Sequence, residues 1–287
     1  SAIFDAVKEK NFKEVKKLIE SGVKINEKDG SSNTILYYAA SFGSLEVVQF
    51  LVEHGADIES RNAKNETALY IASYYGFFDI VKYLVKHGAD VNFENAANGS
   101  PLHFAAASSA LKMVKYLVEY GADIHCRNVE NNTALHYAAY SGSLEVVKYL
   151  TECGADVNCK NNGNCTPLLF AAKRNSFQIV KYLVKQGADI HGSNAENNTA
   201  LHFAAFYGSL PVVQYLTDCG ADVNCKNSDD CSPLHFSAEQ KSFDIVKYLI
   251  EQRGADKHCR NVENNTVLHY AAYSGSLEVV KYLTTSG

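Results

Sequence analysis

The sequence predicts an all-α protein built from one short unit that is repeated along the whole chain. A tetrad of the form Ser/Thr-x-Leu-x recurs about every 33 residues from TILY at Thr34 to TVLH at Thr266, and only the last step is longer, by the inserted Arg253. An apolar face with helical spacing lies between successive tetrads, and a glycine closes that stretch in most units. Such a period is typical of arrays in which each unit packs only on its neighbours.

Each unit is predicted to contain two short helices and an extended finger. The Ser or Thr of the tetrad is a good helix N-cap, and in three units a proline follows at the first helical position, where a missing N–H is harmless. In the unit at 133–165 we expect helices over 134–142 and 143–153, a left-handed turn at Gly154 and an Asn-rich finger. Neither helix can bury its apolar face alone, so neighbouring units must stack.

The tetrads, the Ala-Ala pairs such as 138–139, and the motifs GSLEVVKYL and GADVN resemble the ankyrin-repeat family over essentially the whole chain. The resemblance implies a curved, L-shaped solenoid of stacked helix-turn-helix units with β-hairpin-like fingers. It also implies that partners bind on a concave side formed by the fingers and the first helices. The predicted repeats form a single array over 1–287, namely 1–33, 34–66, 67–99, 100–132, 133–165, 166–198, 199–231, 232–265 and the partial repeat 266–287.

The second half of the sequence has a longer internal period, which is two repeats in length. Every second repeat there lacks the glycine between its helices, which is replaced by Ser109, Asn175 or Lys241. We interpret this as tandem duplication of two-repeat blocks. The last repeat stays apolar and lacks a polar capping helix, so the native protein is expected to continue past Gly287.

Composition and charge exclude several classes of function. The net charge of −5 comes from 27 Lys and Arg against 32 Asp and Glu, without the basic stripe that nucleic-acid binders carry. No apolar run reaches the roughly 18 to 20 residues of a membrane helix, and no catalytic or phosphate-binding motif is present. We therefore expect a non-enzymatic, cytoplasmic monomer that needs no cofactor or metal and that neither binds nucleic acid nor inserts into a membrane.

Two side-chain series at fixed positions predict packing rather than chemistry. One histidine per repeat cannot share a metal with the next, so each imidazole is expected to hydrogen-bond within its own turn. These histidines are His103, His136, His202, His235 and His269. The aromatic residues one position further on are expected to pack between repeats, and they include Tyr38, Phe104, Tyr137, Phe170, Phe203, Phe236 and Tyr270.

The positions seven and eight residues after each N-cap vary most along the first helices. Aromatic rings are costly to expose, and Tyr and Arg are enriched at protein-binding hot spots, so we predict a partner site on the concave side. Its expected residues are Phe42, Tyr74, Tyr75, Tyr140, Lys173, Arg174, Phe206, Tyr207, Glu239 and Tyr273, with a finger rim of Arg61, Phe93, Glu94, Arg127, Lys160, Lys226 and Arg260. The alternative is that some of these rings only cover neighbouring repeats.

Eight cysteines recur with the repeats. The expected finger geometry allows only two disulfides, Cys159–Cys165 and Cys225–Cys231. The remaining four cysteines would be unpaired and no CxxC zinc spacing exists, so we predict free thiols in a reducing cytoplasm. The ankyrin resemblance further implies that asparaginyl hydroxylation could act on Asn92, Asn158 and Asn224, each of which ends a Leu…Asp-Val-Asn pattern.

The function predicted from these patterns is a scaffold that holds a protein or an extended peptide on its concave side. One alternative is the interaction or regulatory array of a larger effector, toxin or channel, which would act in a host cytoplasm if its source were a pathogen. The other alternative belongs to a different class, a metal or redox sensor that uses the cysteines. The sequence does not name the partner.

Overall fold

The computed structural model describes residues 2–97 and 99–285, and within them every repeat contributes a pair of helices. The first helices of the pairs are α1 (Ala2–Lys8), α3 (Ile35–Ser41), α5 (Ala68–Tyr74), α7 (Pro101–Ala107), α9 (Ala134–Ser141), α11 (Pro167–Lys173), α13 (Ala200–Phe206), α15 (Pro233–Glu239) and α17 (Val267–Ser274). The second helices are α2 (Phe12–Glu20), α4 (Leu45–Glu53), α6 (Phe78–Lys86), α8 (Leu111–Glu119), α10 (Leu144–Glu152), α12 (Phe177–Lys185), α14 (Leu210–Asp218), α16 (Phe243–Arg253) and α18 (Leu277–Thr285).

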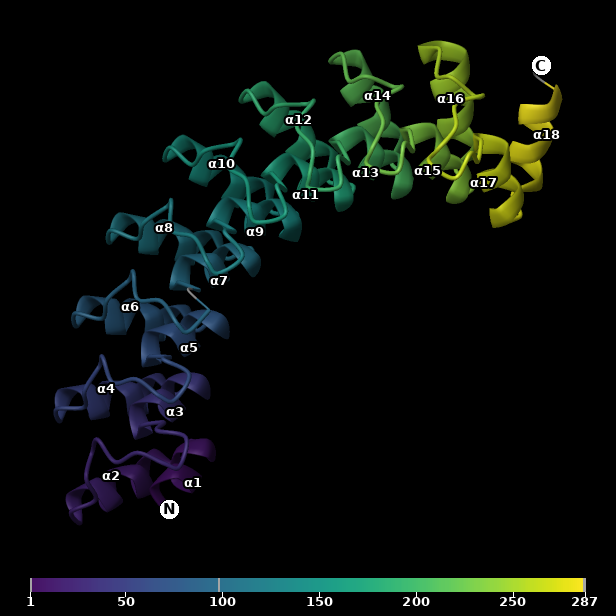
Figure 1. The fold of residues 1–287 in the computed structure, drawn as a ribbon. Coiled ribbons are helices and arrows are strands. Elements are labelled where there is room, and N and C mark those ends of the chain that lie inside the picture. The colour runs from purple at the N-terminus through teal and green to yellow at the C-terminus, as the bar shows by residue number, and fades with distance from the viewer. Residues whose placement is uncertain (1, 98, 286–287) are drawn as a thin grey trace. The chain divides into compact units, whose positions relative to one another are not determined.

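The chain divides into two compact units, a first unit over residues 1–134 and a second unit over residues 135–287. Within each unit the first helices stack in one layer and the second helices in another, and the fingers extend from the stacked pairs (Figure 1). Helix α3 packs on α5 and α5 on α7 in the first unit, as α13 packs on α15 and α15 on α17 in the second. The predicted all-α repeat fold is therefore confirmed.

The helix starts follow from the tetrads. The hydroxyl of Thr34 accepts a hydrogen bond from the Tyr37 amide at 3.1 Å, which satisfies one of the unpaired N–H groups at the start of α3. In four other repeats a histidine completes a reciprocal capping box with the Ser or Thr at the N-cap. The helix starts at Ser100 and Thr199 belong to this second kind.

The core is formed mainly by the apolar stripe of the second helices and by the small residues of the first. In α14, Val212, Val213 and Leu216 are fully buried, and in α13 the pair Ala204 and Ala205 is fully buried as well. Alanine at these positions allows stacked first helices to approach closely. The buried stripe thus has the helical period that the sequence predicts.

Each finger is shaped by an asparagine, or in the first repeat by an aspartate, at its turn. The side-chain oxygen of Asn62 accepts hydrogen bonds from the amides of Lys64 at 3.0 Å and Glu66 at 2.9 Å, and so holds the turn closed. Neighbouring fingers are joined by one backbone hydrogen bond, for example from Ser228 to Glu196 at 2.9 Å. The fingers are therefore hairpin-like and bonded to one another, although only isolated bridges such as Arg260–Thr266 are regular β-structure.

The residues that replace glycine between the helices keep the conformation that glycine adopts. Ser109, Asn175 and Lys241 have φ values of 59°, 55° and 61°, in the left-handed region that L-residues other than Asn rarely adopt. The two-repeat alternation in sequence therefore leaves the backbone unchanged and places mild strain at Ser109 and Lys241.

Across the part of the chain that the structure describes, none of the helices combines the length and the apolar character that spanning a membrane requires.

Candidate functional site

The aromatic residues at position four of each tetrad helix pack between repeats, and those at position seven extend that packing. The ring of Phe206 meets Phe236 of the next repeat edge-on, with ring centroids 5.8 Å apart. Two further pairs follow the same two-repeat period, Tyr74–Phe104 at 5.5 Å and Tyr140–Phe170 at 5.8 Å. Some rings of the predicted partner site therefore do cover neighbouring repeats.

These rings nevertheless keep much of their surface exposed. Tyr74 and Tyr75 are 54% and 55% exposed, and Tyr140 and Tyr207 are 45% and 40% exposed. Lys173 and Arg174 are also exposed, and the guanidinium of Arg174 lies 5.0 Å above the ring centre of Tyr140. Tyr273 is exposed in the last repeat, whereas Phe42, Phe206 and Glu239 are half-buried.

Three hollows lie in the second unit along the side formed by the first helices and the finger tips, which we call the groove face. Hollow A, of about 240 Å³, is lined by Cys165, Leu169, Phe170, Lys173, Asn194, Glu196 and Phe203. Hollow B, of about 270 Å³, is lined by Glu196, Asn198, His202, Phe203, Phe206, Tyr207, Asn227, Asp229 and Phe236. Hollow C, of about 410 Å³, is lined by Glu239, Glu263, Asn265, His269, Tyr270 and Tyr273. Hollows A and B share Glu196 and Phe203, so they are continuous.

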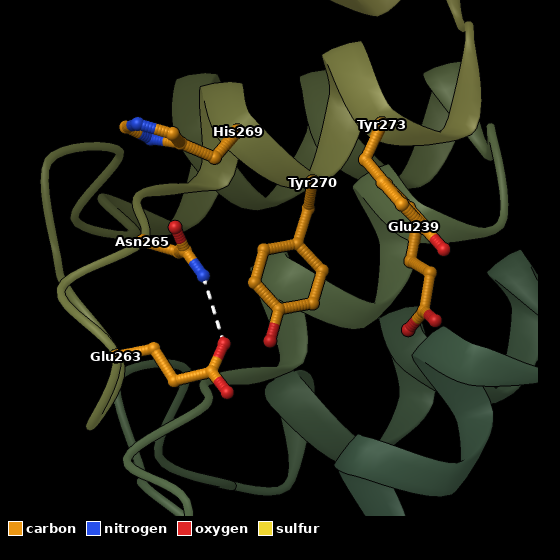
Figure 2. A pocket seen from close by; sticks show the side chains of 6 residues that line it. All are labelled: Glu239, Glu263, Asn265, His269, Tyr270 and Tyr273. Carbon is orange, nitrogen blue, oxygen red and sulfur yellow. Dashed lines mark hydrogen bonds between the residues drawn. The ribbon is translucent and has the colours of Figure 1, made fainter.

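Five of the six residues that line hollow C occupy the same repeat positions as residues that line hollow B, two repeats earlier. The finger-tip pair Glu196 and Asn198 of hollow B corresponds to Glu263 and Asn265 of hollow C. The helix residues correspond in the same way, with His202, Phe203 and Phe206 matched by His269, Tyr270 and Tyr273. In Figure 2 the ring of Tyr270 lies between the Glu263 and Glu239 side chains. The groove face thus repeats one kind of hollow with the two-repeat period of the sequence.

The acidic finger-tip residues of these hollows are oriented by hydrogen bonds. The Asn198 amide donates to Glu196 at 3.2 Å, and Asn265 donates to Glu263 at 3.1 Å (Figure 2). Asn198 is itself held by a hydrogen bond from Asn227 at 3.0 Å. No ion pair forms with Glu196, Asp229, Glu239 or Glu263 among residues 2–97 and 99–285. The groove face of the second unit therefore presents carboxylates that are free to pair with a ligand.

The sequence did not predict Glu196, Asp229 and Glu263 as site residues. The predicted rim residues, such as Arg127, lie six residues before an N-cap, whereas these three acids lie three residues before one. The variation of one finger position between repeats could have indicated these residues. The finger-tip position that these three acids share is occupied by Lys64 and Ala97 in earlier repeats, so its charge changes along the array.

One predicted rim residue is wrong. Phe93 is only 5% exposed, because it occupies the finger position that is turned toward the first helix, where other repeats have Ser60, Cys126 or Cys225. Arg61 lies over its ring at 4.7 Å. Phe93 therefore belongs to the core and cannot contact a partner.

The other predicted rim residues lie on the fingers but make local contacts. The guanidinium of Arg127 donates to the Asn131 carbonyl at 3.2 Å, and Arg260 makes the same contact with Asn264 at 3.0 Å. Lys226 pairs with Asp230 at 4.0 Å. Lys160 is exposed and Glu94 is half-buried, and neither lines one of the three hollows.

Three of the tetrad histidines, His103, His136 and His202, connect their first helix to the finger that follows it. Nδ1 of His202 accepts a hydrogen bond from the Thr199 amide at 3.1 Å, which leaves Nε2–H to donate to the Cys231 carbonyl at 3.0 Å. Burial lowers the pKa of His202 to about 4, so the ring is neutral near pH 7. His103 makes the matching bonds to Ser100 and Asn132 in the first unit. The imidazole thus bonds within its own turn, as predicted, and also to the finger at the end of the same repeat.

A cysteine lies beside each of four buried histidines, which the sequence reasoning did not detect. The Sγ–imidazole distances are 3.7 to 3.8 Å in the pairs Cys126–His103, Cys159–His136, Cys225–His202 and Cys259–His235. In the one intervening repeat that has Leu169 instead of histidine, Gly192 replaces the cysteine. Burial raises the pKa of Cys225 to about 11, so this thiol keeps its proton and is a weak nucleophile. These pairs are packing partners and do not support a redox or metal sensor.

The two disulfides that the sequence left open are absent. All eight cysteines, which lie within the described residues, are free. Cys225 faces Thr199 and His202 of its own repeat, whereas the Cys231 thiol lies 3.1 Å from the Tyr270 hydroxyl of a later repeat. The two sulfur atoms of one finger therefore face different neighbours. Among residues 2–97 and 99–285, moreover, no three His, Cys, Asp or Glu side chains converge as a metal site.

The asparagines considered for hydroxylation bridge consecutive repeats. Asn158 accepts from the Asp189 amide at 2.8 Å and donates to the Gly187 carbonyl at 3.0 Å. Asn92 makes the matching pair of bonds in the first unit, and Asn224 accepts from the Asp256 amide. All three are exposed at the surface, so their amides are accessible although engaged in structural bonds.

Comparison with known families agrees with the repeat pattern. The family described as "Ankyrin repeats (3 copies)" matches residues 3–95, 91–161, 153–227 and 219–287, which together span nearly the whole chain. No curated protein matches the chain as a relative.

Proposed function

The chain belongs to the ankyrin-repeat family, whose members generally mediate protein–protein interaction, and on that premise we propose that it is a non-enzymatic scaffold whose groove face binds an extended segment of another protein. The observation that carries this proposal is the series of hollows in the second unit. Hollows A and B are continuous, and hollow C repeats the lining of hollow B two repeats further along. A series of this kind suits an extended chain better than a compact small molecule.

The aromatic walls of hollow B provide the apolar part of the proposed contact. Phe206 and Phe236 are fixed by their edge-on packing, and Tyr207 packs on Phe206 with ring centroids 5.0 Å apart. Rings that are already ordered lose little conformational entropy when a ligand covers them, which favours affinity. We place the binding centre at Phe206 and Tyr207 for this reason.

The free thiols support a location in the cytoplasm, which we include in the proposal. Four of them lie beside buried histidines in positions where a disulfide would require the fingers to be rebuilt. A reducing compartment preserves such thiols.

The test is selection from a random peptide library with the full chain, followed by affinity measurement on a variant that carries Phe206→Ala and Tyr207→Ala. We expect the selected peptides to bind the unaltered chain and to lose roughly tenfold or more in affinity for the variant, the equivalent of about 1.4 kcal/mol. Tyr120→Ala is the matched control, because Tyr120 is an exposed tyrosine that follows the second helix α8.

Circular dichroism establishes that the variants are folded. Peptides that bind all three proteins equally, or a selection that yields no binding peptide, would overturn the proposal.

A further inference from the structure

Hollows B and C share an electrostatic character as well as a lining. Each is acidic on its finger side, through Glu196 and Asp229 in hollow B and through Glu263 in hollow C, where Glu239 adds a second carboxylate. Glu239 is half-buried and ends helix α15. These four carboxylates have no ion-pair partner in the described parts of the chain. Among the described residues, no lysine or arginine lines hollow B or hollow C, and Lys173 lines only hollow A, which shares Glu196 with hollow B.

The histidine of hollow B does not supply a positive charge. His202 lines the hollow, but its pKa is lowered to about 4 by burial and both of its ring nitrogens are occupied by Thr199 and Cys231. It stays neutral near pH 7. The negative charge of Glu196 and Asp229 consequently faces whatever enters the hollow.

The aromatic walls complete the chemistry of a site for a cationic side chain. A lysine or arginine has an apolar stem and a charged head, and it binds best where rings pack on the stem and carboxylates face the head. Hollow B is lined by Phe206 and Tyr207 together with Glu196. Hollow C offers Tyr270 between Glu263 and Glu239, with Tyr273 beside Glu239 (Figure 2).

We propose, building on the proposed function, that the groove face selects an extended peptide segment with two Lys or Arg side chains, one bound in hollow B and one in hollow C. Helices α13, α15 and α17 stack consecutively, and Glu196 and Glu263 hold the same position before α13 and α17, so these two carboxylates are two helix-packing steps apart. Two such steps are about 16 to 20 Å. An extended chain rises about 3.3 Å per residue, so it covers this distance in about five to six residues.

The lining of hollow A gives the segment a direction. Lys173 lines hollow A on its helix side, and Arg174 follows directly in the chain. On the helix side of hollow A, away from the shared Glu196, repulsion from Lys173 disfavours a cationic side chain. The part of the segment over hollow A is therefore neutral or acidic, and the two basic residues lie toward Glu196 and Glu263.

The experiment measures fluorescence anisotropy of labelled synthetic peptides with the full chain. The test peptide carries two arginines six positions apart in an uncharged host, and the comparison peptides carry two citrullines at the same positions, two arginines three positions apart, or a single arginine. We expect the first peptide to bind at least roughly tenfold more tightly than each of the others. Glu196→Gln and Glu263→Gln are each expected to weaken it several-fold. Glu152→Gln is the control with the same charge change on the exposed face of α10, and it is expected to have no effect.

Equal binding of the citrulline peptide, or an equal loss with Glu152→Gln, would overturn the proposal, because binding would then not depend on charge at the groove face. Equal binding of the two arginine spacings would overturn the use of both hollows by one segment. If the library peptides depend on Phe206 and Tyr207 but contain no basic residues and ignore Glu196→Gln, the inference fails while the proposed function stands. If no peptide depends on those rings, both fail.

Discussion

Two finger carboxylates, Glu66 in the first unit and Glu196 in the second, are used differently on fingers of the same shape. In the first unit the carboxylate of Glu66 accepts hydrogen bonds from the Tyr37 hydroxyl and the Asn62 amide, both at 2.8 Å, and so joins the finger to the first helix of its own repeat. In the second unit the carboxylates of Glu196 and Glu263 each accept an asparagine hydrogen bond and line a hollow. The same finger can therefore support either the fold or a ligand site.

The difference teaches that repeat position, rather than residue type, decides the role of a charged side chain in this array. Glu66 immediately precedes an N-cap, whereas Glu196 lies three residues before one, at the finger tip. A difference of two positions on the finger thus separates a carboxylate that bonds within its repeat from one that lines a hollow. Four predictions test the comparison between the two units by means of matched or contrasting substitutions.

The largest effect is expected from matched core truncations in the two units. Leu84 in α6 and Leu216 in α14 are both fully buried, so replacing either by alanine should lower the free energy of unfolding by about 3 to 4 kcal/mol. Hydrogen exchange followed by mass spectrometry should show faster exchange mainly in residues 1–134 for Leu84→Ala and mainly in 135–287 for Leu216→Ala. Loss of protection spread evenly over both units by either substitution would contradict the division.

Acidification should weaken the second unit through its buried histidine. The pKa of His202 is about 4 in the folded chain and 6.5 in a free imidazole, so its contribution to stability is complete above about pH 6.5 and is lost as the pH falls to 4. A difference of this size corresponds to about 3 kcal/mol, since one pKa unit is about 1.4 kcal/mol. Urea denaturation at pH values from 7 to 4 should show this slope, and His202→Leu should reduce it. An unchanged slope in that variant would show that the imidazole does not carry the effect.

A double-mutant cycle can test the histidine–cysteine pairs in each unit. His202→Leu should destabilise the chain by about 2 kcal/mol, because the Cys231 carbonyl loses its donor and the capping box is lost. Adding Cys225→Gly should recover part of that loss, because the chain itself combines Leu169 with Gly192 at the same two positions.

The matched cycle in the first unit uses His103→Leu and Cys126→Gly. The denaturation midpoints of the four single-substitution variants and the two double variants give the coupling energy of each histidine–cysteine pair. Strictly additive effects in both units would contradict a pairing of the two side chains in the core.

The smallest effect is expected at the left-handed residues between helices. Lys241→Gly in the second unit and Ser109→Gly in the first should each stabilise the chain by about 0.5 to 1 kcal/mol, because glycine relieves the strain of a positive φ. Asn175→Gly is the control, since asparagine tolerates this conformation and its amide donates to the Tyr207 carbonyl at 2.9 Å. Thermal melting measures all three, and a larger gain at Asn175 than at Lys241 would contradict the account.

The period of the sequence predicted the helices, their caps and the repeat stacking, because these depend on spacing along one repeat. The predicted site was less complete, because a period gives the register of an extended finger but not which of its residues turn inward. Phe93 and Arg127 occupy neighbouring register positions of their fingers, yet Phe93 is buried and Arg127 is exposed. The acids of the hollows were missed for the same reason, since the Asn198 amide that orients Glu196 is itself held by Asn227 of the next finger only after the fingers have stacked.

The edge-on ring pairs have a consequence for how such an array can change length. Tyr140 joins its repeat to the following one through Phe170, and Phe206 does the same through Phe236, whereas the repeat between them has Lys173, which has no ring, at that position. A recombination event that inserts or deletes two repeats keeps the alternation between repeats with and without a ring at this position, while deletion of the single repeat that carries Lys173 places two ring-bearing repeats side by side. Gene duplication and loss in this array should therefore proceed in steps of two repeats.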